Sequence, residues 1–437
     1  MAAYQLSDMY FTSQDITARR QKLAAKWDEL LNTGEAVLVY SGEPIQKPGG
    51  LDQNYDFIPH PAYFWLTGRR RESEVLLYSK DMGWVEFQKD IPAEEAVWEG
   101  ERKDLLVSQP GKPKKELDDV VAKFSSVYRL GQSGTPVEGK TFDLRTALDR
   151  ERRKKDAAEV RFIEQLAEIA KHGYQRIQET VHPGITEKAV QLAYEGEVYT
   201  RGGHTMPYDT IVGSGTNSAI LHALPTHKII KENEYVLVDA GVDIYDYCVD
   251  ITRMYYAGNN VSQQHKDLYQ LILRAHEECM AMSKPGVMWR DVHMHAARIT
   301  VDGLLQLGIL KGNADELFER GVSSVFFPHG VGHLVGLRVR DAGHEENVHP
   351  KTYAGARLRV DIELEEDHLV TVEPGCYFIS SLLNDERIRS KYKDEIVWDE
   401  VAKWQHIGGV RIEDNILITA NGNKNLTIDV AKTDVFN

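Results

Sequence analysis

The feature that most constrains the fold of this chain is a series of apolar segments in its second half, each leading into an acidic side chain. Three segments have this form: Val236-Leu237-Val238-Asp239, Leu369-Val370-Thr371-Val372-Glu373 and Val410-Arg411-Ile412-Glu413. Their composition predicts strands. A carboxylate at the end of an apolar strand is costly to bury unless it is paired or binds a metal ion. These strand ends are therefore candidates for charge pairing or metal binding.

Asp239 and Asp250 lie eleven positions apart, and this spacing constrains the chain between them. On one unbroken strand, an odd offset places two side chains on opposite faces of the sheet. If both carboxylates face one site, the chain must turn or bulge between them, and Gly241 could permit that change of direction. A single aspartate more often ends a strand or caps a turn, so neither residue establishes a site by itself.

Two further segments combine glycine with polar side chains. His329 and His333 lie four apart in a loop where glycines let the backbone approach a site closely. A lone histidine is more often structural, but a pair in such a loop favours a functional site. Arg411 and Glu413 share one face of a strand with a period of two. Taken alone, that second pattern is better explained by an exposed Arg–Glu face.

Together these segments supply four carboxylates and one imidazole, from Asp239, Asp250, His333, Glu373 and Glu413. Mixed oxygen and nitrogen donors suit divalent first-row ions such as manganese, cobalt, iron or zinc. Two such ions, about 3.5–4 Å apart, can share bridging carboxylates and a bridging hydroxide. The sequence therefore predicts a two-metal hydrolytic site.

Charge and cysteine content argue against several other classes of protein. The formal net charge of −15 disfavours a nucleic-acid partner. Three scattered cysteines fit a reducing compartment and form no disulfide framework. Residues 1–12 lack the apolar core of a signal peptide, and no run of about 20 apolar residues predicts a membrane span. We expect a cytoplasmic protein that binds neither nucleic acid nor membrane.

The sequence pattern changes near residue 150. The first part predicts a helix with Ser13 as its N-cap, and then short strands: helix Ser13–Leu31, strands Ala36–Tyr40, Tyr63–Thr67, Val75–Ser79 and Trp84–Gln88. The charged run Asp149–Lys155 is typical of a solvated helix face. The second part predicts long helices and further strands: helices Ala157–Val181, 187–199, Gln263–Met282 and Trp289–Leu307, strands Tyr235–Asp239, Tyr245–Tyr256, Leu369–Glu373 and Val410–Thr419. We expect an α/β domain at residues 1–152 and, at residues 153–437, an α+β domain with helices over an antiparallel sheet.

The ordered ligand set resembles that of the pita-bread metallopeptidases, which include methionine aminopeptidase, aminopeptidase P and prolidase. The resemblance covers about residues 155–430, and the segment Tyr63-Phe64-Trp65-Leu66-Thr67-Gly68 resembles the N-terminal domain of that family. It implies an α+β protein with a C-terminal pita-bread catalytic domain and a smaller N-terminal α/β domain that serves packing and dimerisation. It also implies a homodimer with two divalent metal ions per subunit, manganese first and cobalt, zinc or iron as alternatives.

The resemblance implies a role for each candidate residue. Asp239 would bind one metal, His333 and Glu373 the second, while Asp250 and Glu413 would bridge both. A bridging hydroxide would attack the scissile carbonyl, and Glu373 would shuttle the proton to the leaving nitrogen. Other matching positions join the site: His222 and His329 as catalytic candidates, His222 and Tyr377 as substrate contacts, and Arg411 as the partner of a bridging carboxylate.

Two features favour a prolidase, a dipeptidase that cleaves before proline. Glu373 and Glu413 lie 40 positions apart, an insertion similar to that of prolidases. Arg359 lies 14 positions before Glu373 and resembles the prolidase arginine that binds the C-terminal carboxylate of a dipeptide. A surface arginine explains Arg359 nearly as well. The predicted substrate is therefore a small peptide, an Xaa-Pro dipeptide.

Arg340 departs from the family pattern, because Val339-Arg340-Asp341 stands where a histidine is usual in the middle position. Arginine can donate hydrogen bonds to an oxyanion or hold a substrate carboxylate, but it cannot act as a base at neutral pH. Arg340 is thus a catalytic and substrate-binding candidate, and His344 is a candidate replacement for the histidine.

Three alternatives stay open at this point. The first is an aminopeptidase P that acts on longer Xaa-Pro peptides. The second is a non-peptidase hydrolase or lyase that uses the same metal site. The third is a binding protein without activity, which the intact ligand set disfavours.

Overall fold

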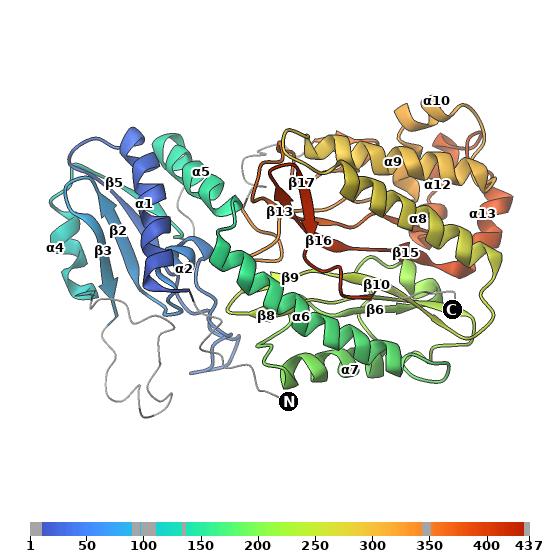
Figure 1. The fold of residues 1–437 in the computed structure, drawn as a ribbon, viewed down its shortest axis with the longest axis horizontal. Coiled ribbons are helices and arrows are strands. Elements are labelled where there is room, and N and C mark those ends of the chain that lie inside the picture. The colour runs from blue at the N-terminus through green and yellow to red at the C-terminus, as the bar shows by residue number, and fades with distance from the viewer. Residues whose placement is uncertain (1–10, 90–96, 98–110, 133–136, 343–350, 432–437) are drawn as a thin grey trace. The chain divides into compact units, whose positions relative to one another are not determined.

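The computed structural model describes residues 11–89, 97, 111–132, 137–342 and 351–431 of the 437-residue chain. The chain divides into two compact units (Figure 1). We call them the N-terminal unit, which ends at Arg153, and the C-terminal unit, which begins at Lys154. Within the described ranges, no helix is both long and apolar enough to cross a membrane.

The N-terminal unit is a mixed sheet packed with helices. Its strands follow the spatial order β4-β3-β2-β1-β5, with β1 (Glu35–Tyr40), β2 (Val75–Ser79), β3 (Gly83–Gln88), β4 (Lys112–Pro113) and β5 (Ser126–Leu130). Strand β2 is antiparallel to β1 and β3, whereas β5 is parallel to β1. The helices are α1 (Ser13–Leu30), α2 (Pro61–Thr67), α4 (Leu117–Val121) and α5 (Gly139–Arg153). The core holds buried apolar strand residues such as Leu38, Leu77 and Phe87.

Two local predictions in the N-terminal unit are wrong. The segment predicted as a strand at Tyr63–Thr67 belongs to helix α2, which has Pro61 in its first turn and ends at Gly68 with a φ of 66°. Its aromatic run is buried on every side, so burial and not strand pairing explains the composition. The N-cap of α1 is Thr12 and not Ser13, because the Thr12 hydroxyl accepts from the Asp15 amide at 3.2 Å.

The charged run Asp149–Lys155 is not the solvated face that we expected. Asp149, Arg152, Arg153 and Lys155 are all buried. Within the C-terminal unit, Lys155 Nζ lies 2.8 Å from Asp341 Oδ2, so this buried ammonium is balanced by a buried carboxylate. A distant part of the chain therefore supplies the partner of Lys155, whereas Arg152 Nη1 lies 3.6 Å from Asp149 Oδ1 within the run itself.

The strands of the C-terminal unit are all paired antiparallel. One sheet has the order β10-β7-β6, with β6 (Ile211–Ser214), β7 (Glu234–Asp239) and β10 (Thr252–Ala257). Another has the order β13-β16-β17, with β13 (Leu369–Val372), β16 (Asp414–Thr419) and β17 (Gly422–Asn425). Three pairs complete the set: β8 (Val242–Ile244) with β9 (Tyr247–Val249), β11 (Thr352–Tyr353) with β12 (Ala356–Arg357), and β14 (Gly375–Tyr377) with β15 (Gly409–Arg411). A bridge between Thr252 and Glu413 brings the first two sheets together.

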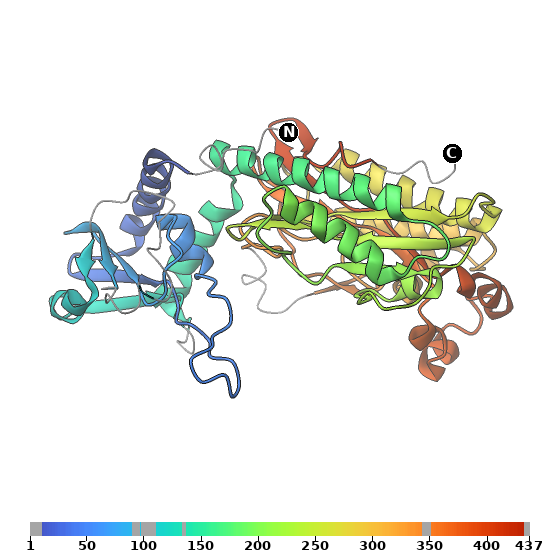
Figure 2. The same cartoon turned by 90° about the horizontal axis from the view of Figure 1, so that it is seen from below.

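Long amphipathic helices cover these strands, as the α+β prediction requires. Helices α6 (Ala157–Thr180) and α7 (Glu187–Thr200) lie along one side of the strands, and α8 (Gln263–Met282) and α9 (Trp289–Gln306) along the other (Figures 1 and 2). Shorter helices follow: α10 (Ala314–Glu319), α11 (Ser380–Leu383), α12 (Glu386–Lys391) and α13 (Trp398–Trp404). Asp156 begins α6 with a capping box to Glu159. The strand ends between the two pairs of long helices carry the candidate ligands.

Candidate metal centre

A tight hairpin brings Asp239 and Asp250 together. Asp239 ends β7, strands β8 and β9 follow, and Asp250 comes directly after β9. The hairpin turns at Tyr245 and Asp246, whose φ angles of 54° and 69° lie in the left-handed region that a two-residue hairpin turn favours. The expected turn is therefore present, and the predicted strand Tyr245–Tyr256 is interrupted. Gly241 does not form the turn. It lets the two backbone segments pack closely, because a Cβ there would lie 2.2 Å from the Val249 carbonyl oxygen.

Tyr208 links the two aspartates and was not found by sequence reasoning. Its hydroxyl lies 2.7 Å from Asp239 Oδ1 and 2.5 Å from Asp250 Oδ1. Nothing in the local sequence distinguishes this tyrosine, since it precedes β6 and meets the aspartates only in the folded chain. A phenol shared by two carboxylates fixes their separation and orientation.

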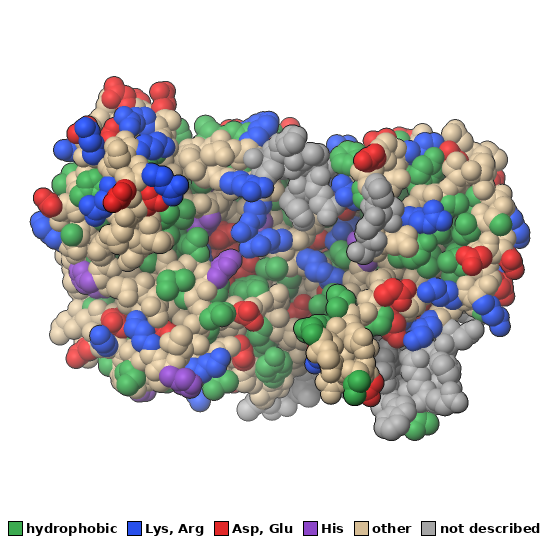
Figure 3. Space-filling view, turned by 180° about the vertical axis from the view of Figure 1, so that it is seen from behind, with side chains coloured by type: hydrophobic (Ala, Val, Ile, Leu, Met, Phe, Trp, Pro, Cys, Tyr) green, Lys and Arg blue, Asp and Glu red, His purple; other side chains and the backbone are tan. Residues whose placement is uncertain are grey.

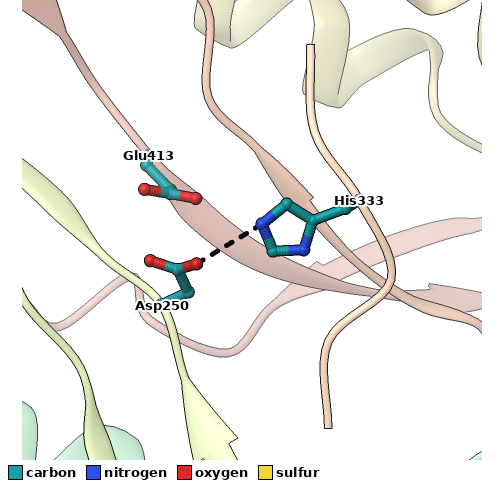
Figure 4. A group of neighbouring side chains, drawn as sticks. All are labelled: Asp250, His333 and Glu413. Atoms are coloured by element: carbon teal, nitrogen blue, oxygen red, sulfur yellow. Dashed lines mark ion pairs between the residues drawn. The ribbon is translucent and has the colours of Figure 1, made fainter. Parts of the chain in front are cut away.

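His333 is oriented by its own backbone. Its Nδ1 lies 3.0 Å from the Leu334 carbonyl, so Nδ1 carries the hydrogen and Nε2 presents a lone pair. That Nε2 lies 3.4 Å from Asp250 Oδ2 and 3.6 Å from Glu373 Oε1. Asp250, His333 and Glu413 each offer an atom within 4.8 Å of the others, and Figure 4 shows the three side chains pointing toward one another.

The two carboxylate oxygens of Glu413 have different surroundings. Its Oε2 accepts a hydrogen bond from Thr252 Oγ1 at 2.8 Å. Its Oε1 is buried, and no residue in the described ranges donates to it. A buried acceptor of this kind is costly to leave unsatisfied. The predicted face of Arg411 and Glu413 is also buried and not exposed, with 3% and 1% of their surfaces accessible.

The electrostatics of the cluster fit bound cations. Burial raises the pKa of Asp239 and Glu413, and mutual repulsion with Asp250 raises both further. Burial likewise raises the pKa of Glu373 to about 7. The pKa of His333 is raised although burial opposes it, because Asp250 and Glu373 favour the protonated ring. These crowded carboxylates, the Glu413 oxygen to which no described residue donates and the Nε2 atom of His333 form a donor set that suits divalent first-row ions.

Arg411 contacts Asp239 and not the carboxylate that we expected. Its Nη2 lies 2.6 Å from Asp239 Oδ2, whereas Asp250 and Glu413 were the predicted bridging residues. Its Nε donates to Thr252 Oγ1 at 3.1 Å and its Nη1 to the Tyr377 hydroxyl at 3.0 Å. One guanidinium therefore orients Asp239 and, through Thr252, also Glu413.

His329 and Tyr377 extend this network toward Glu373. The Tyr377 hydroxyl lies 2.8 Å from His329 Nε2, and His329 Nδ1 lies 2.8 Å from the Gly330 carbonyl and 3.8 Å from Glu373 Oε2. Burial and then the charge of Arg411 lower the pKa of His329 to about 3. The neutral ring is suited to hold Tyr377 and not to carry a charge.

Three exposed side chains interact electrostatically with the cluster or with one another: His222, Arg340 and Arg359. Burial lowers the pKa of His222, and the positive charges of Arg340 and Arg359 lower it further. Both arginines therefore favour the neutral form of this histidine. In the part of the chain that the structure describes, neither arginine has an ion pair. On the face drawn in Figure 3, acidic side chains lie recessed beside Lys, Arg and His side chains. His344 lies outside the described residues.

Replacing Tyr208 with phenylalanine is expected to weaken manganese binding by about tenfold, because hydrogen bonds that orient metal-binding carboxylates typically contribute 10–100-fold. Calorimetric titration of metal-stripped protein measures this change. Tyr256→Phe is the matched control, since its hydroxyl donates to the Asn260 carbonyl at 3.0 Å, away from the cluster. Equal affinities of the Tyr208 variant and wild type would show that the shared phenol does not orient the ligands.

Comparisons with known proteins identify what the chain is similar to. Residues 161–420 match metallopeptidase family M24, and residues 16–106 match the aminopeptidase P N-terminal domain. A probable Xaa-Pro aminopeptidase of Talaromyces marneffei is 32% identical over 428 residues, 90% of each chain. Another of Sordaria macrospora is 34% identical over 412 residues, 90% of this chain and 88% of the relative. The solved structure of E. coli aminopeptidase P with the inhibitor Pro-Leu matches with a TM-score of 0.79 at 25% identity and covers 97% of both chains.

Proposed function

Because the chain belongs to metallopeptidase family M24, we propose that it is an Xaa-Pro aminopeptidase, which releases the first residue of a peptide whose second residue is proline. The pita-bread fold and a metallopeptidase site with divalent ions follow from that membership. The proposal favours the aminopeptidase alternative over the prolidase expectation, since the relatives described above are named Xaa-Pro aminopeptidases. The observation that carries it is the buried cluster of Asp250, His333 and Glu413.

The residues of the cluster would divide the chemistry between them. Two divalent ions, held by Asp239, Asp250, His333, Glu373 and Glu413, would supply an activated water and polarise the scissile carbonyl. One oxygen of Glu373 lies 3.6 Å from His333 Nε2 and the other lies 3.8 Å from His329 Nδ1. In the proposed reaction, Glu373 would pass a proton to the leaving nitrogen. His222 would orient the peptide beside the cluster.

A dipeptidase activity is the second candidate, and the two arginines favour it. Burial lowers the pKa of Arg359, and the positive charge of Arg340 lowers it further. The two positive charges therefore lie near each other. Unpaired guanidinium groups bind carboxylates well. A dipeptide would place its C-terminal carboxylate there, whereas a longer peptide continues past that point. Arg340 then serves as a substrate-binding residue and not as a proton carrier.

Substrate length separates the two activities. We expect protein that is stripped with chelator and reloaded with manganese to cleave Ala-Pro-Ala at least about tenfold faster, in kcat/KM, than Ala-Pro. Arg359→Met is expected to change cleavage of the tripeptide less than about threefold. The matched control is Arg357→Met, an exposed arginine two positions away.

The opposite result would identify a dipeptidase. Preference for Ala-Pro, with a loss of about 10–100-fold in Arg359→Met, would assign the C-terminal carboxylate to this arginine, because a hydrogen bond to a charged group contributes about 1.5–3 kcal/mol. No metal-dependent cleavage before proline would contradict both activities. The identity of the metal, the homodimer and the cytoplasmic location stay predictions.

A further inference from the structure

Glu187 is a buried carboxylate outside the candidate metal centre, and its hydrogen bonds enclose the segment that carries His222. It is the first residue of α7 and is fully buried. Its Oε1 accepts from Ser214 N at 2.9 Å, Ser214 Oγ at 2.8 Å and Asn217 Nδ2 at 3.0 Å. Its Oε2 accepts from Thr226 N at 3.3 Å and Thr226 Oγ1 at 2.9 Å. One side chain therefore joins both ends of residues 214–226.

These five hydrogen bonds constrain the segment strongly. Bonds to an ionised acceptor are shorter and about twice as strong as those between neutral groups. Ser214 ends β6, Asn217 lies in the 3-10 helix η3 (Gly215–Ala219), and Thr226 follows His222 by four positions. Lys228 Nζ lies 4.0 Å from Glu187 Oε1 and balances part of the buried charge. The position of α7 thus determines where the segment lies.

The same segment is tied to the strands of the metal centre. Ser218 Oγ accepts from Gly409 N at 2.8 Å, at the start of the strand that leads to Arg411. The Ala223 carbonyl, next to His222, accepts from Val212 N at 3.2 Å on β6. Strand β6 pairs with β7, which ends at Asp239. The segment that carries His222 is therefore bound on one side by Glu187 and on the other by the strands that lead to the candidate ligands.

We propose that Glu187 is a positioning residue for peptide hydrolysis, whose carboxylate holds residues 214–226 so that His222 contacts the substrate. This inference rests on the proposed function. Without the carboxylate, the buried donors of Ser214, Asn217 and Thr226 would lose their acceptor, and the segment would relax toward water. Glu187 contacts none of the candidate metal ligands in the hydrogen bonds described, so its effect passes through His222.

A double-mutant cycle in the full, manganese-loaded chain tests this inference. Glu187→Gln keeps the shape of the side chain but turns an amide N–H₂ toward groups that are themselves donors. It is expected to lower kcat/KM for Ala-Pro-Ala about tenfold in the wild-type background, and less than about twofold when His222→Ala is already present. Losses that multiply independently in the two backgrounds would overturn the proposal.

Hydrogen exchange separates this inference from the proposed function. Backbone amides of residues 215–226 are expected to exchange about tenfold faster in Glu187→Gln, with bound manganese unchanged. Glu197→Gln is the matched control on α7. The Oε1 atom of Glu197 lies 2.6 Å from Arg201 Nε, and both side chains are partly exposed. Unchanged exchange in residues 215–226 would overturn the anchoring role. If wild type cleaves no Xaa-Pro peptide, the proposed function fails, and faster exchange still supports the anchor.

Discussion

Replacing Glu413 with glutamine is expected to reduce hydrolysis of Ala-Pro-Ala by about a thousandfold or more and to weaken manganese binding in parallel. Glu413 Oε1 is buried without a hydrogen-bond donor in the described ranges, so this oxygen is available to a cation. Thr252 already orients the other oxygen at 2.8 Å. Glutamine keeps the size of the side chain but removes the charge that offsets the metal. Kinetics and manganese titration of the same preparations measure both effects.

The same substitution is expected to have the opposite effect on stability when no metal is present. Burial, then repulsion from Asp250, Glu373 and Asp239, raises the pKa of Glu413. A carboxyl group with a raised pKa stabilises the folded chain fully below its unfolded-state pKa of about 4.3, and this contribution is lost as pH rises through the folded-state pKa. Metal-free Glu413→Gln should therefore melt above metal-free wild type, by a margin that grows as the pH rises above the unfolded-state pKa of about 4.3.

Manganese should reverse this order, because wild type gains binding energy that the variant lacks. The control is Glu366→Gln, an exposed glutamate of the C-terminal unit, which should melt like wild type under both conditions. If Glu413→Gln bound manganese with wild-type affinity, or melted below wild type in the absence of metal, the assignment of Glu413 as a ligand would be wrong.

The candidate ligands could be predicted from sequence because each follows a recognisable local pattern. Asp239 and Glu373 end apolar strands, and a turn between Asp239 and Asp250 was required for the two to face one site. The structure has that turn and places Asp250, His333 and Glu413 together. Tyr208 and Thr252 contact the same carboxylates but could not be predicted, because their positions depend on strand pairing between distant segments. The hydroxyl groups of these two residues also produce no hydrophobic periodicity that could be recognised in the sequence.

The fold predictions failed where tertiary contacts outweigh local composition. Aromatic residues at Tyr63–Thr67 indicated a strand, but Pro61 and Gly68 at the two ends favour a short helix, and burial on all sides removes any periodicity. The charges at Asp149–Lys155 indicated a solvated face, yet Lys155 pairs with Asp341, 186 positions away. The sequence around the charged run does not indicate that Asp341 is the partner of Lys155.

Replacing Arg253 with methionine is expected to destabilise the C-terminal unit by about 3–5 kcal/mol, because it removes the guanidinium that pairs with a buried carboxylate. Arg253 is 1% exposed, and its Nη2 lies 2.6 Å from Asp414 Oδ1. Its other nitrogens donate to the carbonyls of Glu413 at 2.6 Å, Thr252 at 3.0 Å and Val430 at 3.1 Å. This guanidinium thus joins β10, the start of β16 and the segment after β17. Denaturant unfolding followed by circular dichroism measures the loss.

The controls separate a buried charge from a general loss of arginine. Arg274→Met removes a surface pair with Glu278 and should cost no more than about 0.5 kcal/mol. Adding Asp414→Asn to Arg253→Met should restore part of the stability, since the buried negative charge that Arg253 balanced is then also removed. Because Arg253 holds the Glu413 backbone, the single variant should also bind manganese more weakly than Arg274→Met. A cost below about 1 kcal/mol with unchanged manganese affinity would mean that the C-terminal segment and the metal centre are not coupled through Arg253.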